Sequence, residues 1–206
     1  MQIILAPDRN YGFSSYLINL GIERPRPVSD LERSIVLVGI MGAGKSSIGK
    51  RLATRLNLPF VDADHEIEAA AGCSIPDLFE LHGEAAFREG EHRVIKRLLD
   101  GPVQVIATGG GAYMDSRTRE LIEKSAISIW LKADIEVLLK RVARRSNRPL
   151  LKTGDPREIL HDLMKERYPV YSGAQITIES KDGPHEDVID LVLDALRAYR
   201  EQAAAS

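Results

Sequence analysis

Gly39-Ile-Met-Gly-Ala-Gly-Lys45-Ser46 is the stretch of the chain that decides the fold. It satisfies the pattern G-x-x-x-x-G-K-[ST], follows the apolar run Ile35–Val38 and leads into the helical pattern Lys45–Leu56. A strand, a glycine-rich turn and a helix in this order form a P-loop, whose backbone N–H groups and helix N-terminus face phosphates. Lys45 is then placed to reach the β- and γ-phosphates of a nucleotide, and Ser46 to ligate Mg²⁺. The alternative, a glycine-rich turn that binds nothing, is disfavoured because pattern, strand and helix all agree.

Outward from this motif, short β-branched runs alternate with longer segments of helical spacing. The alternation predicts an α/β domain with a mostly parallel sheet. The expected strands are Ile35–Val38, Pro59–Val61, Val103–Ala107, Ile127–Leu131 and Gln175–Ile178. The expected helices are Lys45–Leu56, Asp64–Ala71, Glu84–Leu99, Ser116–Lys124, Ile135–Arg144, Arg157–Glu166 and Glu186–Tyr199. We expect residues 1–33 to be an extension or linker, residues 34–200 to be one domain, and residues 201–206 to be a frayed tail.

Composition excludes several classes of function. Lys and Arg number 28 against 30 Asp and Glu, a formal charge of −2, which provides no global field for nucleic acid or anionic lipid. No run of apolar residues is long enough to cross a membrane, and the N-terminus lacks the pattern of a secretory signal. The single cysteine, Cys73, can form no disulfide within the chain. We therefore expect a cytoplasmic enzyme that binds neither nucleic acid nor membrane.

Carboxylates follow the second predicted strand. Asp62 and Asp64 stand one residue apart at its end, where open α/β sheets bind ligands. One is suited to a position near Mg²⁺ and the other to a position near an acceptor hydroxyl. The alternative is that both solvate a loop, or that Asp64 caps the following helix. The P-loop one strand earlier favours the functional interpretation.

An arginine on the next long helix has an acidic residue within reach. Arg88 and Glu91 are three residues apart, so Glu91 can hold the guanidinium in position for a substrate carboxylate. An ordinary surface ion pair is the competing interpretation.

Thr108 is followed by three glycines, Gly109, Gly110 and Gly111, where many P-loop proteins carry a Walker-B aspartate. Glycines let a small ligand approach the sheet edge closely, although a plain flexible turn would look the same in sequence. Because the aspartate is missing, we expect the metal to be held by Ser46 and Asp62.

Basic residues cluster again between Arg141 and Leu151, with four arginines in eight positions. Such a loop could close over ATP and bring the guanidinium of Arg148 to the transferring phosphoryl group. A solvated basic loop or a nucleic-acid patch is the alternative, but no aromatic residues are interleaved to stack on bases. Arg167 stands at a predicted helix end, where an arginine more often interacts with the helix dipole.

Six motifs in this order resemble the shikimate kinase family, from about Ser34 to the last helix. They are G-x-M-G-x-G-K-S-S at Gly39–Ser47, D-x-D at Asp62 and Asp64, F-R-x-x-E at Phe87–Glu91, the triple glycine, R-P-L-L at Arg148–Leu151 and R-x-P-x-Y at Arg167–Tyr171. The resemblance implies a three-layer P-loop kinase fold with a central five-stranded parallel sheet, flanking helices and a mobile lid. It also implies that ATP and shikimate give 3-phosphoshikimate and ADP, a step of aromatic amino-acid biosynthesis, with one Mg²⁺ per subunit and in a monomer.

The resemblance implies roles for individual residues. Asp64, Lys45 and Arg148 would be catalytic. ATP would be bound by Gly42, Ala43, Gly44, Lys45, Ser46, Ser47, Arg141 and Arg148. Shikimate would be bound by Asp64, Arg88, Gly109, Gly110, Gly111 and Arg167. Two other functions remain open at this point: another small-acid kinase, such as a gluconate-type kinase, or a nucleotide-binding regulatory module without catalysis.

Overall fold

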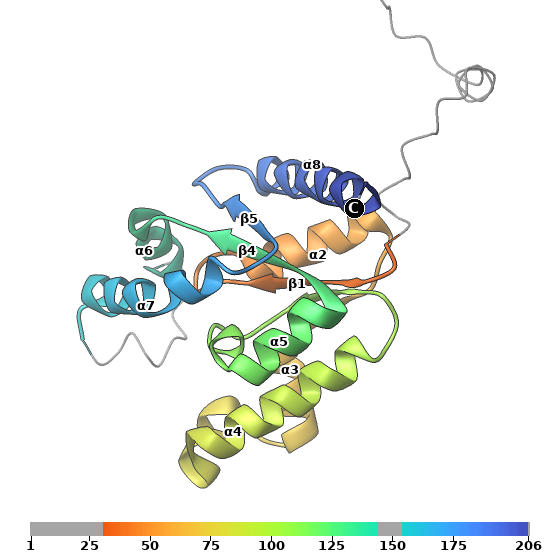
Figure 1. Cartoon of the computed structure of the whole chain (residues 1–206). Helices are drawn as coiled ribbons and strands as arrows, with labels where there is room; N and C mark the ends of the chain where they lie inside the picture. Colours follow the sequence, from red (N-terminus) through yellow and green to blue (C-terminus); the bar gives the residue numbers. More distant parts are fainter. Residues whose placement is uncertain (1–30, 144–153, 206) are drawn as a thin grey trace, which may run out of the picture.

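A parallel sheet forms the centre of the molecule. The computed structural model describes residues 31–143 and 154–205, and within these ranges five strands pair in the order β2-β3-β1-β4-β5 (Figure 1). The strands are β1 (Ser34–Val38), β2 (Phe60–Asp62), β3 (Val105–Ala107), β4 (Ala126–Lys132) and β5 (Ile176–Glu179). Every pairing is parallel, and Ile35 of β1 is in register with Val105 on one side and Ile127 on the other. The predicted five-stranded P-loop kinase fold is confirmed.

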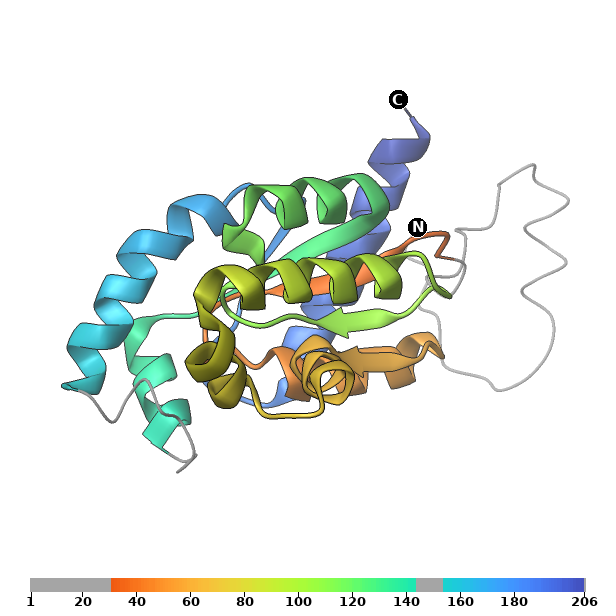
Figure 2. The same ribbon diagram turned by 90° about the horizontal axis from the view of Figure 1, so that it is seen from below.

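Helices cover both faces of this sheet. They are α2 (Lys45–Leu56), α3 (Ala63–Ala71), α4 (Ile75–Leu99), α5 (Ser116–Ser125), α6 (Ile135–Ala143), α7 (Pro156–Tyr171) and α8 (His185–Ala204), with a short 3-10 helix η1 at Ala112–Met114. Figures 1 and 2 show α2 and α8 on one face and α3, α4 and α5 on the other, while α6 and α7 lie toward the carboxyl edge of the sheet.

Alternation along β1 explains the two cores. Ile35 and Leu37 pack into the cluster under α2 and α8, whereas Val36 and Val38 pack into the cluster under α3, α4 and α5. Because successive strand residues point to opposite faces, a strand that is apolar at every position belongs between two layers. Because β1 ends at Val38, Gly39 and the P-loop that follows lie at the carboxyl edge of the sheet.

Helix α4 begins nine residues earlier than the predicted Glu84. The Ser74 side chain accepts from the Asp77 backbone, and the Asp77 carboxylate accepts from the Ser74 backbone, so a capping box starts the helix. Gly83, with φ 77° and ψ 172°, then breaks the helical conformation inside the element. The capping box could have been read from the sequence, but the glycine breaks the periodicity that the prediction followed.

Helix α7 ends five residues later than the predicted Glu166. It runs through Pro169 to Tyr171, although an interior proline removes a backbone hydrogen bond. Helix α8 also ends five residues later than the predicted Tyr199, at Ala204, so most of the predicted tail 201–206 is helical. Smaller differences concern β3, which begins at Val105 rather than Val103, and η1, which was not expected. At β3, the Gln104 backbone N–H donates to the Ser34 hydroxyl at 3.2 Å, instead of to a carbonyl of the sheet.

Residues just before β1 belong to the packed domain. Leu31 is 8% exposed within the core, and the Arg33 guanidinium donates to the Glu123 carbonyl at 2.8 Å and to the Ala126 carbonyl. The domain therefore includes residues that the sequence assigned to the extension. The predicted lid residues 144–153, Arg148 among them, and residues 1–30 lie outside the described part of the chain.

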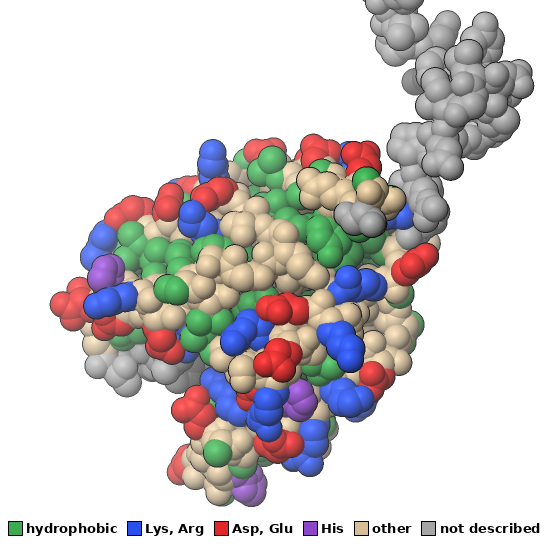
Figure 3. All heavy atoms as spheres, in the orientation of Figure 1, with side chains coloured by type: hydrophobic (Ala, Val, Ile, Leu, Met, Phe, Trp, Pro, Cys, Tyr) green, Lys and Arg blue, Asp and Glu red, His purple; other side chains and the backbone are tan. Residues whose placement is uncertain are grey.

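Charges of both signs are mixed on the surface. Figure 3 shows Lys and Arg side chains interspersed with Asp and Glu over the face that carries α4 and α5. Many of them pair, as Arg117 does with Glu89 at 2.9 Å and Lys96 with Asp100 at 2.6 Å. Among the helices that the structure describes, none is long and apolar enough to cross a membrane.

Candidate active site

The P-loop takes a backbone conformation that requires its glycines. Gly39, Gly42 and Gly44 have φ of 143°, 84° and 102°, a region that residues with a Cβ rarely occupy. At Gly39 a Cβ would also stand 2.9 Å from the Leu131 carbonyl oxygen of β4. The Lys45 ammonium donates to the Gly39 and Ile40 carbonyls at 2.7 and 3.1 Å, so it lies folded over the loop that it is predicted to serve.

Ser46 and Asp62 meet beside the P-loop. The Ser46 hydroxyl donates to Asp62 Oδ2 at 2.7 Å, while Asp62 Oδ1 accepts from the Asp64 backbone N–H at 3.2 Å and caps α3. Asp62 therefore caps α3 and also contacts Ser46. In the sequence analysis, Asp64 was the candidate for the helix cap. The two oxygen ligands suit a hard cation such as Mg²⁺, which usually takes one or two protein ligands and completes its shell with waters and phosphates. The described residues contain no group of three or more His, Cys, Asp and Glu side chains that could hold a metal ion.

Asp64 occupies a position that disfavours its charge. Burial raises the pKa of Asp64 above its ordinary value of 3.8, the neighbouring Asp62 carboxylate raises it further, and Lys45 opposes both effects. A carboxylate with a raised pKa is a better proton acceptor. Gly109 lies directly against it, because a Cβ at that position would stand 2.6 Å from Asp64 Oδ1.

Arg88 is held by two carboxylates of its own helix. Its Nη1 donates to Glu91 Oε2 at 2.6 Å, and its Nε and Nη2 donate to Glu84 Oε1 at 3.4 and 3.2 Å. Glu91 is 2% exposed and Glu84 is 69% exposed, so the first contact is part of the interior and the second lies at the surface. A Cβ on Gly111 would collide with the guanidinium.

Arg167 reaches the middle glycine from the opposite side. Its Nη1 donates to the Gly110 carbonyl at 3.0 Å, and the Tyr171 hydroxyl donates to the same oxygen. Its Nε is buried and has no hydrogen-bond acceptor among the described residues. A buried donor without a partner is costly, which makes this nitrogen a candidate for a ligand contact.

The three glycines therefore join the two sides of the site. Gly109 lies against Asp64 and also close to Glu91, Gly110 lies against Arg167, and Gly111 lies against Arg88. A Cβ at Gly110 would also lie 3.7 Å from the Gly39 carbonyl oxygen and 3.7 Å from the Met41 nitrogen of the P-loop. Residues from β1, α3, α4, β3 and α7 converge on this short turn.

Arg141 links the P-loop to the residues that follow the edge strand β5. From α6 its Nη1 donates to the Ala43 carbonyl at 3.1 Å and the Ser180 hydroxyl at 2.9 Å, and its Nη2 donates to the Lys181 carbonyl at 2.6 Å. The remaining predicted P-loop residue, Ser47, lies in the first turn of α2 beside Ser46.

Three residues near the site were given no role by the sequence. Tyr171 shares a helix face with Arg167, and Glu84 shares one with Arg88, so the i,i+4 spacing was the available signal. Ser180 is 1% exposed and donates to the Ala43 carbonyl at 3.0 Å. No local pattern marks Ser180, because its partner lies 137 residues away in sequence.

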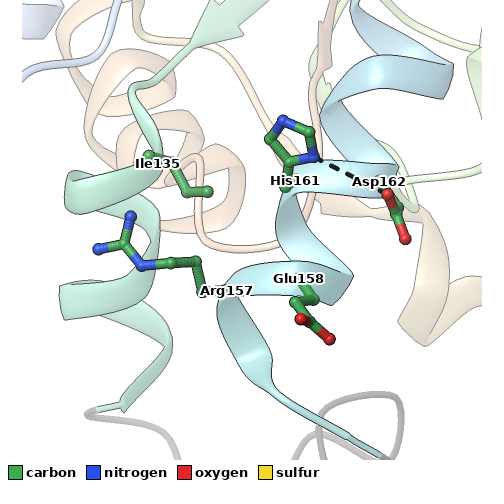
Figure 4. A pocket seen from close by; sticks show the side chains of 5 residues that line it. All are labelled: Ile135, Arg157, Glu158, His161 and Asp162. Atoms are coloured by element: carbon green, nitrogen blue, oxygen red, sulfur yellow. Dashed lines mark ion pairs between the residues drawn. The ribbon is translucent and has the colours of Figure 1, made fainter.

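Two surface hollows in the described part of the chain lie outside this constellation. One of about 470 Å³ lies between α6 and α7 and is lined by Ile135, Arg157, Glu158, His161 and Asp162 (Figure 4). The other, of about 520 Å³, lies between α3 and α4. Neither is lined by a residue predicted for the site.

Known proteins share both the sequence and this architecture. A family model described as shikimate kinase matches residues 41–197. The shikimate kinase of Bradyrhizobium diazoefficiens is 59% identical over 174 residues, 84% of each chain, and that of Paramagnetospirillum magneticum is 59% identical over 81% of this chain and 86% of its own. A structure of shikimate kinase from Acinetobacter baumannii in complex with shikimate has a TM-score of 0.76 at 40% identity, covering 83% of this chain and 96% of that one. A gluconokinase structure from Sinorhizobium meliloti has a TM-score of 0.59 at 19% identity, covering 84% and 97%, and so shares the fold alone.

Proposed function

The chain belongs to the shikimate kinase family, and on that premise we propose that it transfers the γ-phosphate of ATP to the 3-hydroxyl of shikimate through the residues gathered at the triple glycine. The products are 3-phosphoshikimate and ADP. The observation that carries this proposal is the setting of the three glycines, where an added Cβ would meet the carboxylate of Asp64 and the guanidiniums of Arg167 and Arg88.

The acceptor side suits a small hydroxy acid. Arg88 and Arg167 approach the glycine turn from α4 and α7, and two guanidiniums can bind one carboxylate strongly. The Asp64 carboxylate accepts a hydrogen bond from the substrate hydroxyl and then takes the hydroxyl proton, a role supported by the raised pKa of Asp64. The glycines leave room for the ring of the substrate next to the P-loop.

The donor side supplies charge and alignment. Phosphoryl transfer needs little covalent chemistry from the protein, so positioning and electrostatic stabilisation dominate. The P-loop amides and Lys45 bind the phosphates of ATP, and Arg141 holds the carbonyls of that loop. Arg148, outside the described residues, is proposed as the lid arginine that meets the transferring group.

Ser46 and Asp62 are the residues proposed to hold Mg²⁺. A Mg²⁺ ion held by these two residues would supply positive charge to offset the negative charge that develops during phosphoryl transfer. Ser46→Ala and Asp62→Asn should each raise the Mg²⁺ concentration needed for half-maximal rate. Titrating Mg²⁺ in a coupled assay of ADP release with shikimate measures this. An unchanged midpoint in both variants would remove Ser46 and Asp62 from the metal site.

The deciding experiment is coupled ADP release from ATP and Mg²⁺ with shikimate, with gluconate and with no acceptor. Release that depends on shikimate supports the proposal. Release with gluconate alone would keep the kinase and discard the acceptor assignment. ATP binding without stimulated release would favour a regulatory nucleotide-binding module.

We propose, as the resemblance to the family implies, that the enzyme acts as a monomer. Light scattering at the assay concentration would test this.

A further inference from the structure

The centre of the acceptor site is held by a tyrosine that has no role in the mechanism above. Tyr171, the last residue of α7, is 0% exposed, and its hydroxyl donates to the Gly110 carbonyl. Arg167, one helical turn earlier, donates from Nη1 to the same oxygen at 3.0 Å. One carbonyl therefore accepts from two side chains, only one of which is proposed to bind substrate.

The ring of Tyr171 has little freedom to move. It packs in an aromatic cluster, with centroids 6.0 Å from Trp130, 6.3 Å from Tyr113 and 6.4 Å from Tyr168. Burial raises the pKa of its hydroxyl to about 12, so it remains a donor throughout the physiological range. Arg167 differs, because an arginine side chain has several rotatable bonds, so its guanidinium can turn from the Gly110 carbonyl toward an anion.

Substrate binding sets up a competition at this carbonyl. When the Arg167 guanidinium turns toward a substrate carboxylate, its bond to the Gly110 carbonyl is weakened, and this partly buried carbonyl loses one of its two donors. The Tyr171 hydroxyl keeps that carbonyl satisfied. It also keeps the Gly110 peptide in place between Arg167 and the P-loop, where a Cβ would lie 3.4 Å from Arg167 Nη1 and 3.7 Å from the Gly39 carbonyl oxygen.

We propose that Tyr171 is a positioning residue for the acceptor: by donating to the Gly110 carbonyl it fixes the glycine turn and releases Arg167 to bind the shikimate carboxylate. The inference rests on the proposed function, because Arg167 acts on shikimate only there. In this role Tyr171 acts through Gly110 and Arg167 and not on the substrate itself.

The chain supplies a matched control. Tyr168 belongs to the same helix and the same aromatic cluster, 4.9 Å from Trp130, and its hydroxyl donates to the Ala133 carbonyl at 2.5 Å. Ala133 follows β4 and has no part in the proposed site. Tyr171→Phe and Tyr168→Phe each remove one hydroxyl that donates to a backbone carbonyl, from a buried ring at Tyr171 and from a partly buried ring at Tyr168, and both variants should remain folded.

The test measures the dissociation constant of shikimate by calorimetry, KM for shikimate and for ATP, and the thermal midpoint of the full chain. Tyr171→Phe should weaken shikimate about tenfold, equivalent to about 1.4 kcal/mol, with KM for ATP within twofold of the wild type. Tyr168→Phe should leave both constants unchanged at a similar midpoint. Equal shikimate affinity in the two variants would overturn the proposal, as would loss of the fold in Tyr171→Phe alone, since the hydroxyl would then serve the fold.

A double-mutant cycle with Arg167→Lys tests the route of the effect. If Tyr171 acts through Arg167, the loss caused by Tyr171→Phe should shrink to within twofold in the Arg167→Lys background. Full additivity would contradict it. Failure of the wild type to phosphorylate shikimate would refute the proposed function instead, whereas a wild type that turns over, an impaired Arg167→Lys and a normal Tyr171→Phe would refute this inference alone.

Discussion

The surroundings of Asp64 favour its proposed role as a base but reduce the stability of the fold. Burial and the nearby Asp62 carboxylate raise its pKa, which makes it a stronger base. The same surroundings make its negative charge a cost to the folded state. At pH values below the ordinary pKa of 3.8, the Asp64 carboxyl is neutral in both the folded and the unfolded state. As the pH rises toward the raised pKa of the folded state, the unfolded chain releases this proton more readily, so ionisation of Asp64 destabilises the folded state.

Asp64→Asn should therefore separate activity from stability. Turnover should fall by about 10²–10⁴ because the amide cannot accept the proton. The variant should melt above the wild type at pH 7.5, and the difference should shrink at pH 4, which differential scanning calorimetry at the two pH values measures. Unchanged turnover would remove Asp64 from the mechanism, and a lower midpoint at pH 7.5 would contradict the electrostatic account.

Glu84 occupies one edge of the Arg88 guanidinium, where a substrate carboxylate would compete with it. Because Glu84 is 69% exposed, the pair is weak, and Glu84→Gln should lower KM for shikimate only about two- to threefold. Steady-state kinetics with varied shikimate measures this.

Glu89→Gln is the control for that prediction. Glu89 lies on the same helix and pairs with Arg117 at 2.9 Å rather than with Arg88. An equal fall in KM for both variants would indicate a general effect of net charge and not displacement of Glu84.

Helix α4 holds two glycines in different conformations. Gly83 has φ 77° and ψ 172°, a region that is almost restricted to glycine, whereas Gly90 lies in regular helix. Neither has an atom within 4 Å of the position that a Cβ would take, so contacts do not distinguish them.

Alanine at these two positions should consequently have opposite effects. Gly90→Ala should stabilise the fold by about 0.5–1 kcal/mol through reduced backbone entropy. Gly83→Ala should destabilise it by about 1–3 kcal/mol through backbone strain. Urea unfolding of both variants measures the two free energies. Stabilisation by Gly83→Ala would mean that α4 tolerates a straight path through this position.

Helix α7 illustrates where local patterns stop being sufficient. Pro169 argues for a helix end near Glu166, because an interior proline costs about 3 kcal/mol. In the fold, Tyr171 is buried against Trp130 and Tyr113, and this packing offsets the cost. The extension matters for the site, since only a continuous helix puts Arg167 and Tyr171 on one face toward Gly110.

The start of the domain gives a prediction for the molecule as a whole. A chain beginning at Leu31 should keep kcat and both KM values within twofold, because every site residue lies later in the sequence. A chain beginning at Ser34 loses the buried Leu31 side chain and the Arg33 bonds to two carbonyls, one in the last turn of α5 and one at the start of β4. Relative to the first truncation it should lose about 3 kcal/mol.

Thermal unfolding of the two truncated chains measures that difference. A loss of this size corresponds to a midpoint roughly 6–12 °C lower for a domain of this length. Equal midpoints would place the start of the stable domain after Arg33.

The sequence alone determined the class of fold and the residues of the proposed donor site, because both depend on local order. A strand, a glycine turn and a helix are contiguous, so the phosphate-binding loop and the positions of Lys45 and Ser46 follow from short-range geometry. The motif order was also sufficient to identify the family and to name Asp64, Arg88 and Arg167. Arg88 and Glu91 were predictable as a pair for the same reason, since one helix sets their spacing.

Only the tertiary structure decided how the proposed acceptor site is assembled. Asp64, Arg88 and Arg167 come from three helices, and only chain packing determines that each lies against a different glycine of one turn. The contacts of Ser180 with Ala43 and of Tyr171 with Gly110 join residues 137 and 61 positions apart. Such contacts leave no local periodicity in the sequence, because they depend on which strand ends and helix ends meet at the carboxyl edge of the sheet.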